Sequence, residues 1–276
     1  MRAHVFAILG LLGVGCAGSV DVEVVRVPID APAHDPAHDP ADTLPRGFAD
    51  DDGTAAPGVA DPVEDPLEDP IDPIDPTDPI DPIDDVNLFV LAGLPAPVAA
   101  DAARALGNAR LQGLVEGSLF TVIDFSQPST QRRLWTLNID DAEVLVHDHV
   151  SHGSGSNSED DAAMAALFSN TSGSLQSSLG LARTAETYQG SNGYSLRLDG
   201  LEASNDNMRV RAIVMHGASY AEDAFIDANG YLGRSSGCPA VALSRSAALI
   251  DLLKEGTLLF SWFPDQSWRA SSPFLR

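Results

Sequence analysis

Proline follows aspartate again and again in the first third of this 276-residue chain, and that repeat restricts what the region can form. The Asp-Pro pairs stand at 35–36 and 39–40, and then at 61–62, 65–66, 69–70, 72–73, 75–76, 78–79 and 81–82. Proline fixes φ and removes a backbone donor, so a three-residue spacing suits an extended polyproline II chain and disfavours regular helix or sheet. We therefore expect no packed core in this part of the chain.

The same region carries much of the negative charge of the chain. Residues 17–85 hold 20 of the 40 acidic residues and 13 of the 19 prolines, with only Arg26 and Arg46 as cations. Such a segment buries too little apolar surface to offset its ordering entropy. We expect residues 17–86 to form a disordered acidic Asp-Pro-rich linker and residues 87–276 to form one folded domain. The net charge of −24 argues against nucleic-acid binding, because phosphates require a basic patch.

The first sixteen residues predict export. A short positive start precedes the apolar run Val5–Val14, which is too short to span a bilayer, and small residues surround Cys16. This arrangement resembles the bacterial lipoprotein signal, in which cleavage before the cysteine is followed by lipidation of its sulfur. We expect residues 1–16 to be a signal peptide, Cys16 to be lipidated, and the protein to be periplasmic, as an outer-membrane lipoprotein. Ordinary secretory cleavage without a lipid is the alternative.

Cysteine counting leaves one thiol over. The chain has two cysteines, so Cys238 has no disulfide partner if Cys16 carries lipid. A free cysteine is often a buried, inert residue, but Cys238 stands between Gly237 and Pro239 in a turn-like sequence rather than in an apolar run. A base or positive charge activates a thiol by lowering its pKa. We therefore expect Cys238 to titrate below the reference value of about 8.5.

A histidine is placed to act as that base. His216 ends the apolar run Ile213–Met215 and precedes Gly217, so we expect its ring to project at the end of a strand beside a turn. Gly237 permits close approach to the sulfur, and adjacent backbone N–H groups there are candidate oxyanion donors. The pattern indicates nucleophilic catalysis by a cysteine with a histidine base.

The folded part shows many short β-type runs and few helices. Strands are predicted at 119–125, 133–138, 142–147, 182–187, 194–198, 210–216 and 258–263. Helices are predicted at 97–114, 160–168 and 244–254, the last with Ser244 as its N-cap. This balance predicts a mainly β fold, a β-sandwich or barrel-like domain with a few helices.

Together these motifs resemble the catalytic domain of the murein L,D-transpeptidase family of the YkuD type. His216-Gly217 is followed, after a loop, by residues 233–240, which read Gly-Arg-Ser-Ser-Gly-Cys-Pro-Ala. A divergent branch of the family carries Gly-Arg-Ser-x-Gly-Cys-Pro-Ala, and the resemblance extends over residues 117–263. Ser236 stands where the usual signature has a second histidine, and Ala240 replaces its terminal polar residue.

The resemblance implies a role for each site residue. Cys238 attacks the carbonyl of an L-centre to D-residue peptide bond in a peptidoglycan stem peptide and forms a thioester. His216 acts as the base and is oriented by the backbone carbonyl of Gly217. N–H groups around Gly237 and Cys238 stabilise the oxyanion.

Further residues near the cysteine are candidate substrate contacts. Ser235 and Ser236 lie beside the nucleophile in sequence, and the charge of Arg234 suits a substrate carboxylate. His152 begins a Gly-Ser-Gly loop and is expected to contact the substrate or to support the site. His147, His149 and His152 also suggest zinc, but no glutamate base follows them at helical spacing. We expect no metal and no cofactor.

Two other functions stay open. The same fold and nucleophile with water as acceptor would give an L,D-carboxypeptidase or endopeptidase. A non-catalytic wall-tethering lipoprotein is the third function, and Ser236 in place of the second histidine keeps it open. In each case the expected partners are peptidoglycan stem peptides and a membrane bound through the N-terminal lipid.

Overall fold

The computed structural model describes residues 82–276, so the predicted signal peptide, Cys16 and most of the predicted linker lie outside the described residues. The described part is mainly β, as predicted. Its strands are β1 (Leu119–Asp124), β2 (Leu134–Asn138), β3 (Glu143–Asp148), β4 (Gly180–Gly190), β5 (Gly193–Gly200), β6 (Val214–Ala218), β7 (Ala240–Ala242) and β8 (Leu258–Trp262). Its α-helices are α1 (Pro82–Leu91), α2 (Ala96–Leu111), α3 (Asp223–Asn229), α4 (Leu243–Leu253) and α5 (Gln266–Ser271). Two short 3₁₀ turns are η1 (Ser154–Ser156) and η2 (Ser219–Ala221).

All eight strands belong to one mixed sheet in the order β3-β2-β1-β8-β4-β5-β6-β7. The pairs β1–β8 and β6–β7 are parallel and the others are antiparallel. The short strand β7 is therefore an edge of the sheet, and it pairs with the strand that carries His216.

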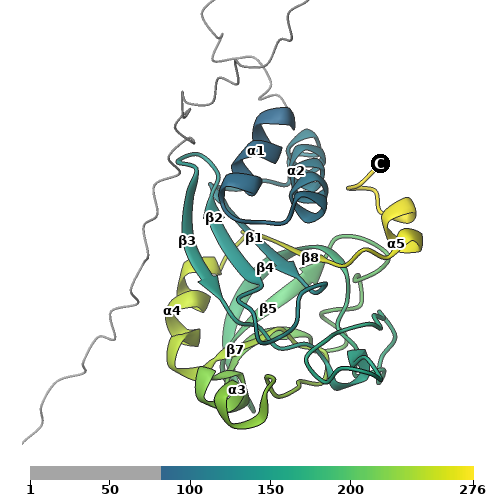
Figure 1. The fold of residues 1–276 in the computed structure, drawn as a ribbon. Helices are drawn as coiled ribbons and strands as arrows, with labels where there is room; N and C mark the ends of the chain where they lie inside the picture. Colours follow the sequence, from purple (N-terminus) through teal and green to yellow (C-terminus); the bar gives the residue numbers. More distant parts are fainter. Residues whose placement is uncertain (1–81) are drawn as a thin grey trace, which may run out of the picture. The chain divides into compact units, whose positions relative to one another are not determined.

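Helices pack against both halves of the sheet. Strands β6, β7 and β8 are buried along their whole length. α1 and α2 pack together, with α2 against β1 and β8, whereas α4 packs against β5, β6 and β7 (Figure 1). The apolar spacing that predicted α2 buries one face of that helix, including Ala99, Ala102 and Leu106.

The two edges of the sheet are joined through the chain that follows β3. Ser151 N–H donates to Ala240 O (2.8 Å), and Ser154 N–H donates to Ser235 O (2.8 Å). Ser235 N–H in turn donates to His152 O (3.1 Å). We call this contact between residues 151–154 and 235–240 the seam. Because Cys238 lies within the second segment, the seam holds the backbone on both sides of the cysteine.

Three predicted elements differ from the structure. Residues 160–168 are not helical, because Asp161 accepts from Ala163 N–H in a turn and Ser158 N–H donates to Met164 O. Ser244 is not an N-cap: its N–H and its hydroxyl both donate to the Glu222 carboxylate, at 2.8 and 2.9 Å.

The strand predicted from Val210 begins only at Val214. Consecutive turns run through residues 205–211 and end at Ala212, whose φ of +54° is left-handed. Because of these turns, β6 begins four residues later than predicted.

α1 begins at Pro82, inside the segment assigned to the linker. Proline is tolerated in the first turn of a helix, where its missing N–H has no helical acceptor. Asp85 is buried and accepts from Arg110 of α2 (2.6 Å), which ties this end of the predicted linker to the domain. Within residues 82–276, no helix has both the length and the apolar character needed to cross a membrane.

Candidate active site

His216 occupies the middle of β6 and is 4% exposed. Its Nδ1 lies 3.1 Å from the carbonyl oxygen of Gly217. A carbonyl only accepts hydrogen bonds, so Nδ1 carries the proton and Nε2 keeps its lone pair. Burial lowers the pKa of His216 below its ordinary value of 6.5, so the ring is a neutral base at neutral pH.

Gly217 is required next to the histidine for packing. A Cβ on Gly217 would lie 2.3 Å from Ser246 Oγ of α4, closer than real Cβ contacts allow. Helix α4 therefore packs directly on the backbone that orients His216.

Cys238 is 7% exposed and its sulfur contacts the chain just before His216. Val214 N–H donates to Sγ (3.5 Å), and the thiol donates to Ala212 O (3.7 Å). Burial raises the pKa of Cys238, while Val214 N–H and the charge of Arg211 act in the opposite direction. The prediction that this thiol titrates below its reference value is therefore wrong for the free protein. Both groups are therefore neutral at neutral pH: burial raises the pKa of the thiol and lowers that of the imidazole.

Ser235 and Gly237 shape the backbone around the nucleophile. Ser235 Oγ donates to Cys238 O (2.6 Å) and accepts from Gly237 N–H (3.1 Å). Gly237 has φ +115°, and a Cβ there would lie 2.7 Å from Gln176 O. Ser235 is thus a structural part of the turn, and the Gly237 N–H already has an acceptor. Ser236 is exposed beside them.

His152 lies behind the site rather than on its surface. It is fully buried, its Nδ1 accepts from Arg133 Nη2 (2.8 Å), and its Nε2 donates to Asn157 Oδ1 (3.0 Å). Burial, together with the charges of Arg133 and Arg234, lowers the pKa of His152 to about 3. This geometry agrees with the expectation that His152 supports the site. It does not agree with direct substrate contact, because the ring is buried and both of its nitrogens are bonded within the protein.

Arg234 is held by the same network. Its Nε donates to Asn157 Oδ1 and its Nη1 donates to Leu232 O, while the guanidinium lies over the ring of Tyr231. Only the Nη2 side has no intramolecular acceptor among residues 82–276. A substrate carboxylate would have to approach from that side.

Sequence reasoning missed several residues of the site. Arg211 interacts electrostatically with Cys238, and so does Tyr220, which η2 carries just after β6. Burial and the neighbouring Cys238 raise the pKa of Tyr220 to about 12, so its hydroxyl remains a donor. Arg133 and Asn157 complete the support of His152. Arg211 and Tyr220 thus lie near Cys238, and Arg133 and Asn157 contact His152. The folded chain determines these contacts, and no motif in the sequence marks the four residues.

The three histidines considered for zinc do not converge. His147 stacks on Trp135 and its Nε2 donates to Arg132 O, whereas His152 is buried against Arg133. The remaining one, His149, belongs to a different cluster.

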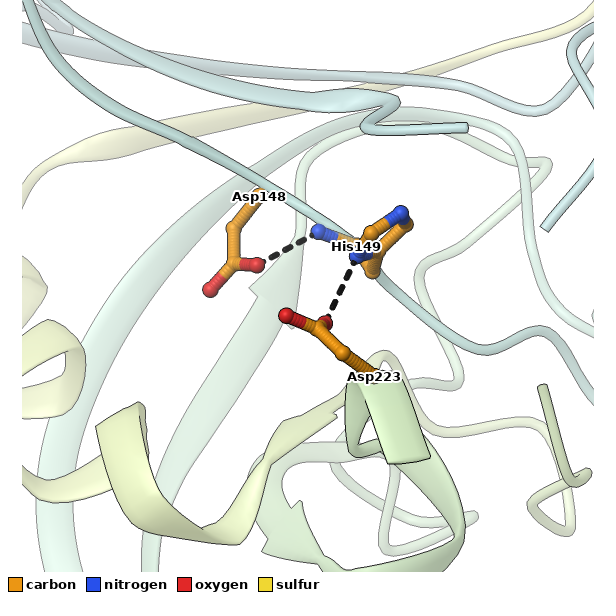
Figure 2. Close-up of side chains that lie close together, drawn as sticks. All are labelled: Asp148, His149 and Asp223. Carbon is orange, nitrogen blue, oxygen red and sulfur yellow. Dashed lines mark hydrogen bonds and ion pairs between the residues drawn. The ribbon is translucent and has the colours of Figure 1, made fainter. Parts of the chain in front are cut away.

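That cluster joins His149 to two carboxylates (Figure 2). Asp148 accepts from His149 N–H (2.7 Å), and Asp223 Oδ1 lies 3.0 Å from His149 Nδ1. Arg245 donates to both carboxylates, twice to Asp148 and once to Asp223. Because Arg245 forms ion pairs with both carboxylates, the cluster is an ion-pair network that fastens α3 and α4 to the end of β3.

The fold and the site together define a class of protein: a mainly β domain with a histidine on β6 and a cysteine in the turn two residues before β7, the parallel partner of β6. Sequence comparison gives the family. The profile of the L,D-transpeptidase catalytic domain matches residues 92–262, which is more than half of the chain and includes His216 and Cys238. The chain belongs to this family.

Comparison with solved structures finds distant similarity to L,D-transpeptidases. The Mycobacterium smegmatis enzyme is 13% identical, with 53% of this chain and 59% of that one covered and a TM-score of 0.33. For Mycobacterium tuberculosis L,D-transpeptidase 1 the identity is 14%, the coverage 53% and 62%, and the TM-score 0.30. The Stackebrandtia nassauensis protein is 12% identical, with 66% of this chain and 75% of that one covered and a TM-score of 0.32. The chain thus spans less than two thirds of the two mycobacterial proteins, and no curated protein matches it in sequence.

Proposed function

We propose that this protein is an exported, cysteine-dependent peptidoglycan L,D-transpeptidase that acts on stem peptides through a thioester on Cys238. The observation that carries the proposal is the hydrogen bond from His216 Nδ1 to Gly217 O, in a chain of the L,D-transpeptidase family. That bond leaves Nε2 as the proton acceptor on β6, which pairs with the strand that begins two residues after Cys238.

The chemistry follows from this pair of neutral groups. The Cys238 proton moves to His216 Nε2 as the sulfur attacks the carbonyl carbon of the L-to-D peptide bond. The C–N bond then breaks, the imidazolium gives its proton to the departing amine, and a thioester remains. An acceptor amine attacks the thioester, its proton passes to His216, and the sulfur leaves. A thioester preserves the acyl group for transfer as long as water is kept from it.

The oxyanion needs donors near the sulfur. Ser235 Oγ already accepts from the Gly237 N–H, so the proposed backbone donor is the N–H of Cys238 itself. The Tyr220 hydroxyl is the proposed second donor, because it has no intramolecular hydrogen bond within the described residues and interacts with Cys238.

The test is incubation of the protein with tetrapeptide muropeptides and an amine acceptor, with product masses read by mass spectrometry. An acyl-enzyme adduct with a cross-linked or exchanged product supports transfer. Tripeptide alone would identify an L,D-carboxypeptidase. Intact substrate without an adduct would leave the wall-tethering function.

The pH dependence of this reaction should reflect His216. Because burial lowers its pKa, the ring stays unprotonated at pH values where an exposed histidine is already charged. We expect the acid limb of kcat/KM against pH to have its midpoint below 6.5, the ordinary value. A midpoint above 6.5 would contradict the assignment of His216 as base.

Ser236→Ala is expected to have a small effect, less than about threefold on kcat/KM. Ser236 is exposed, and no side-chain hydrogen bond joins it to the rest of the described domain. Ser235→Ala is the matched comparison, since its hydroxyl bonds to both sides of the turn, and we expect a much larger loss. Equal losses in the two variants would show that Ser236 contacts the substrate.

We further propose that a lipid on Cys16 anchors the protein to the outer membrane, and that the acidic segment is a spacer. At roughly 3.1 Å per residue, an extended polyproline II segment of this length would reach on the order of 150–200 Å. Such a reach would allow an anchored domain to work at a distance from the membrane.

A further inference from the structure

Two backbone groups of the segment that leads into β6 contact the Cys238 sulfur. Ala212 O accepts from the thiol and Val214 N–H donates to the sulfur, so these two groups favour opposite protonation states. Arg211 immediately precedes them. Ala212 adopts the left-handed conformation at φ +54°, which is uncommon for alanine and turns the chain sharply at this point.

The guanidinium of Arg211 is half-buried and bonded only to neutral groups. Its Nη1 donates to Ser169 O (2.7 Å) and Ser178 Oγ (2.6 Å), and its Nη2 donates to Gln176 O (2.7 Å) and Ser174 Oγ (3.2 Å). In the part of the chain that the structure describes, no carboxylate forms an ion pair with it.

Most other arginines of this acidic domain do have such a partner. Arg209, Arg245 and Arg269 each donate to at least one aspartate. A half-buried cation without a counter-ion favours an anion in its neighbourhood, because low polarity strengthens their attraction.

The 169–178 loop, which Arg211 holds by hydrogen bonds, packs against the residue before the nucleophile. Gln176 O accepts from Arg211 Nη2, and the same oxygen would lie 2.7 Å from a Cβ on Gly237. Arg211 is thus connected to the nucleophile in two ways: it precedes Ala212, whose carbonyl accepts from the thiol, and it holds Gln176 O, which packs against Gly237.

We propose that Arg211 is the counter-charge of the Cys238 thiolate, a positioning residue that makes transfer of the thiol proton to His216 Nε2 more favourable. The inference rests on the proposed role of Cys238 as nucleophile. The other titratable group that interacts with Cys238 is Tyr220, which stays neutral. His216, the proposed proton acceptor, lies on β6 two residues after Val214, whose N–H donates to the sulfur. The buried thiol would then ionise when His216 and Arg211 act together.

The test is alkylation of the full chain by iodoacetamide at a series of pH values, with modification of the Cys238 peptide read by mass spectrometry so that Cys16 does not interfere. For Arg211→Gln we expect the midpoint of the rate to move to higher pH and the rate at neutral pH to fall roughly tenfold. Arg211→Lys, which keeps the charge, should recover most of that loss. Ser178→Ala removes a loop contact without removing charge and should leave the midpoint unchanged.

The outcomes separate this inference from the proposed function. Equal shifts of the pH midpoint in all three variants would show that Arg211 only stabilises the 169–178 loop, and would overturn the inference. No shift in Arg211→Gln would overturn it as well. A shift confined to Arg211→Gln supports the inference even if muropeptides are not turned over, because iodoacetamide needs no peptide specificity.

Discussion

Cys238→Ala is expected to abolish acyl transfer from tetrapeptide muropeptides, lowering turnover by on the order of 10⁴-fold or more. The change removes the atom that would form the thioester, and the described domain holds no second cysteine to replace it. The fold should tolerate it, because alanine fills part of the same buried site and leaves the backbone of the turn intact. Mass spectrometry of the intact protein after incubation with substrate would show the adduct in the wild type and none in the variant.

Ser235→Ala serves as the folding control for this experiment. It disturbs the same turn but keeps the thiol, so it should still form a slow adduct, whereas Cys238→Ala should form none. Thermal unfolding of both variants should resemble that of the wild type within a few degrees. Product formation by Cys238→Ala at the wild-type rate would remove the thioester from the mechanism.

Acidification is expected to destabilise the domain through His152, by about 1.4 kcal/mol of unfolding free energy for each pH unit below 6.5. The fully buried ring binds a proton only near pH 3 in the folded state, whereas the unfolded chain takes it up near 6.5. Between these values the unfolded state binds the extra proton, so stability falls as the pH falls. Urea unfolding at a series of pH values would measure the slope.

His152→Asn should make that slope shallower. Asparagine keeps an acceptor toward Arg133 but does not titrate, so the variant should be less stable at neutral pH and lose less on acidification. His147→Asn is the matched control, since His147 is exposed on β3 and its removal should change the slope much less. An unchanged slope in His152→Asn would exclude this residue as the source of acid sensitivity.

Much of the fold was predictable because it depends on local patterns. The strands at β1, β2 and β8 and the long helix α2 followed from apolar spacing, and the mainly β class from their number. Elements shorter than two turns, such as α3 and α5, have too little periodicity to be recognised. The false helix at 160–168 shows the converse error: an alanine-rich stretch in which side-chain bonds of Asp161 stabilise a turn instead.

The site was predictable only where it is local. The hydrogen bond of His216 to Gly217 O is the one that the family resemblance implied, whereas Ser235, expected to contact the substrate, instead bonds to Cys238 O within the turn. The protonation of the thiol was not predictable, because burial depends on every segment packed over it. The role of Arg211 was not predictable either, because its hydrogen bonds are to the 169–178 loop, which is distant in sequence.

The seam links the order in which the chain folds to the order of the turn that carries Cys238. The segments 151–154 and 235–240 are far apart in the chain, and contacts between distant segments form late because loop closure costs entropy. A chain with its central strands paired but its edges still apart would hold Cys238 on a loose turn, without the hydrogen bonds of Ser235 to residues 152 and 154. The turn that holds Cys238 would therefore become ordered late in folding, when the seam closes.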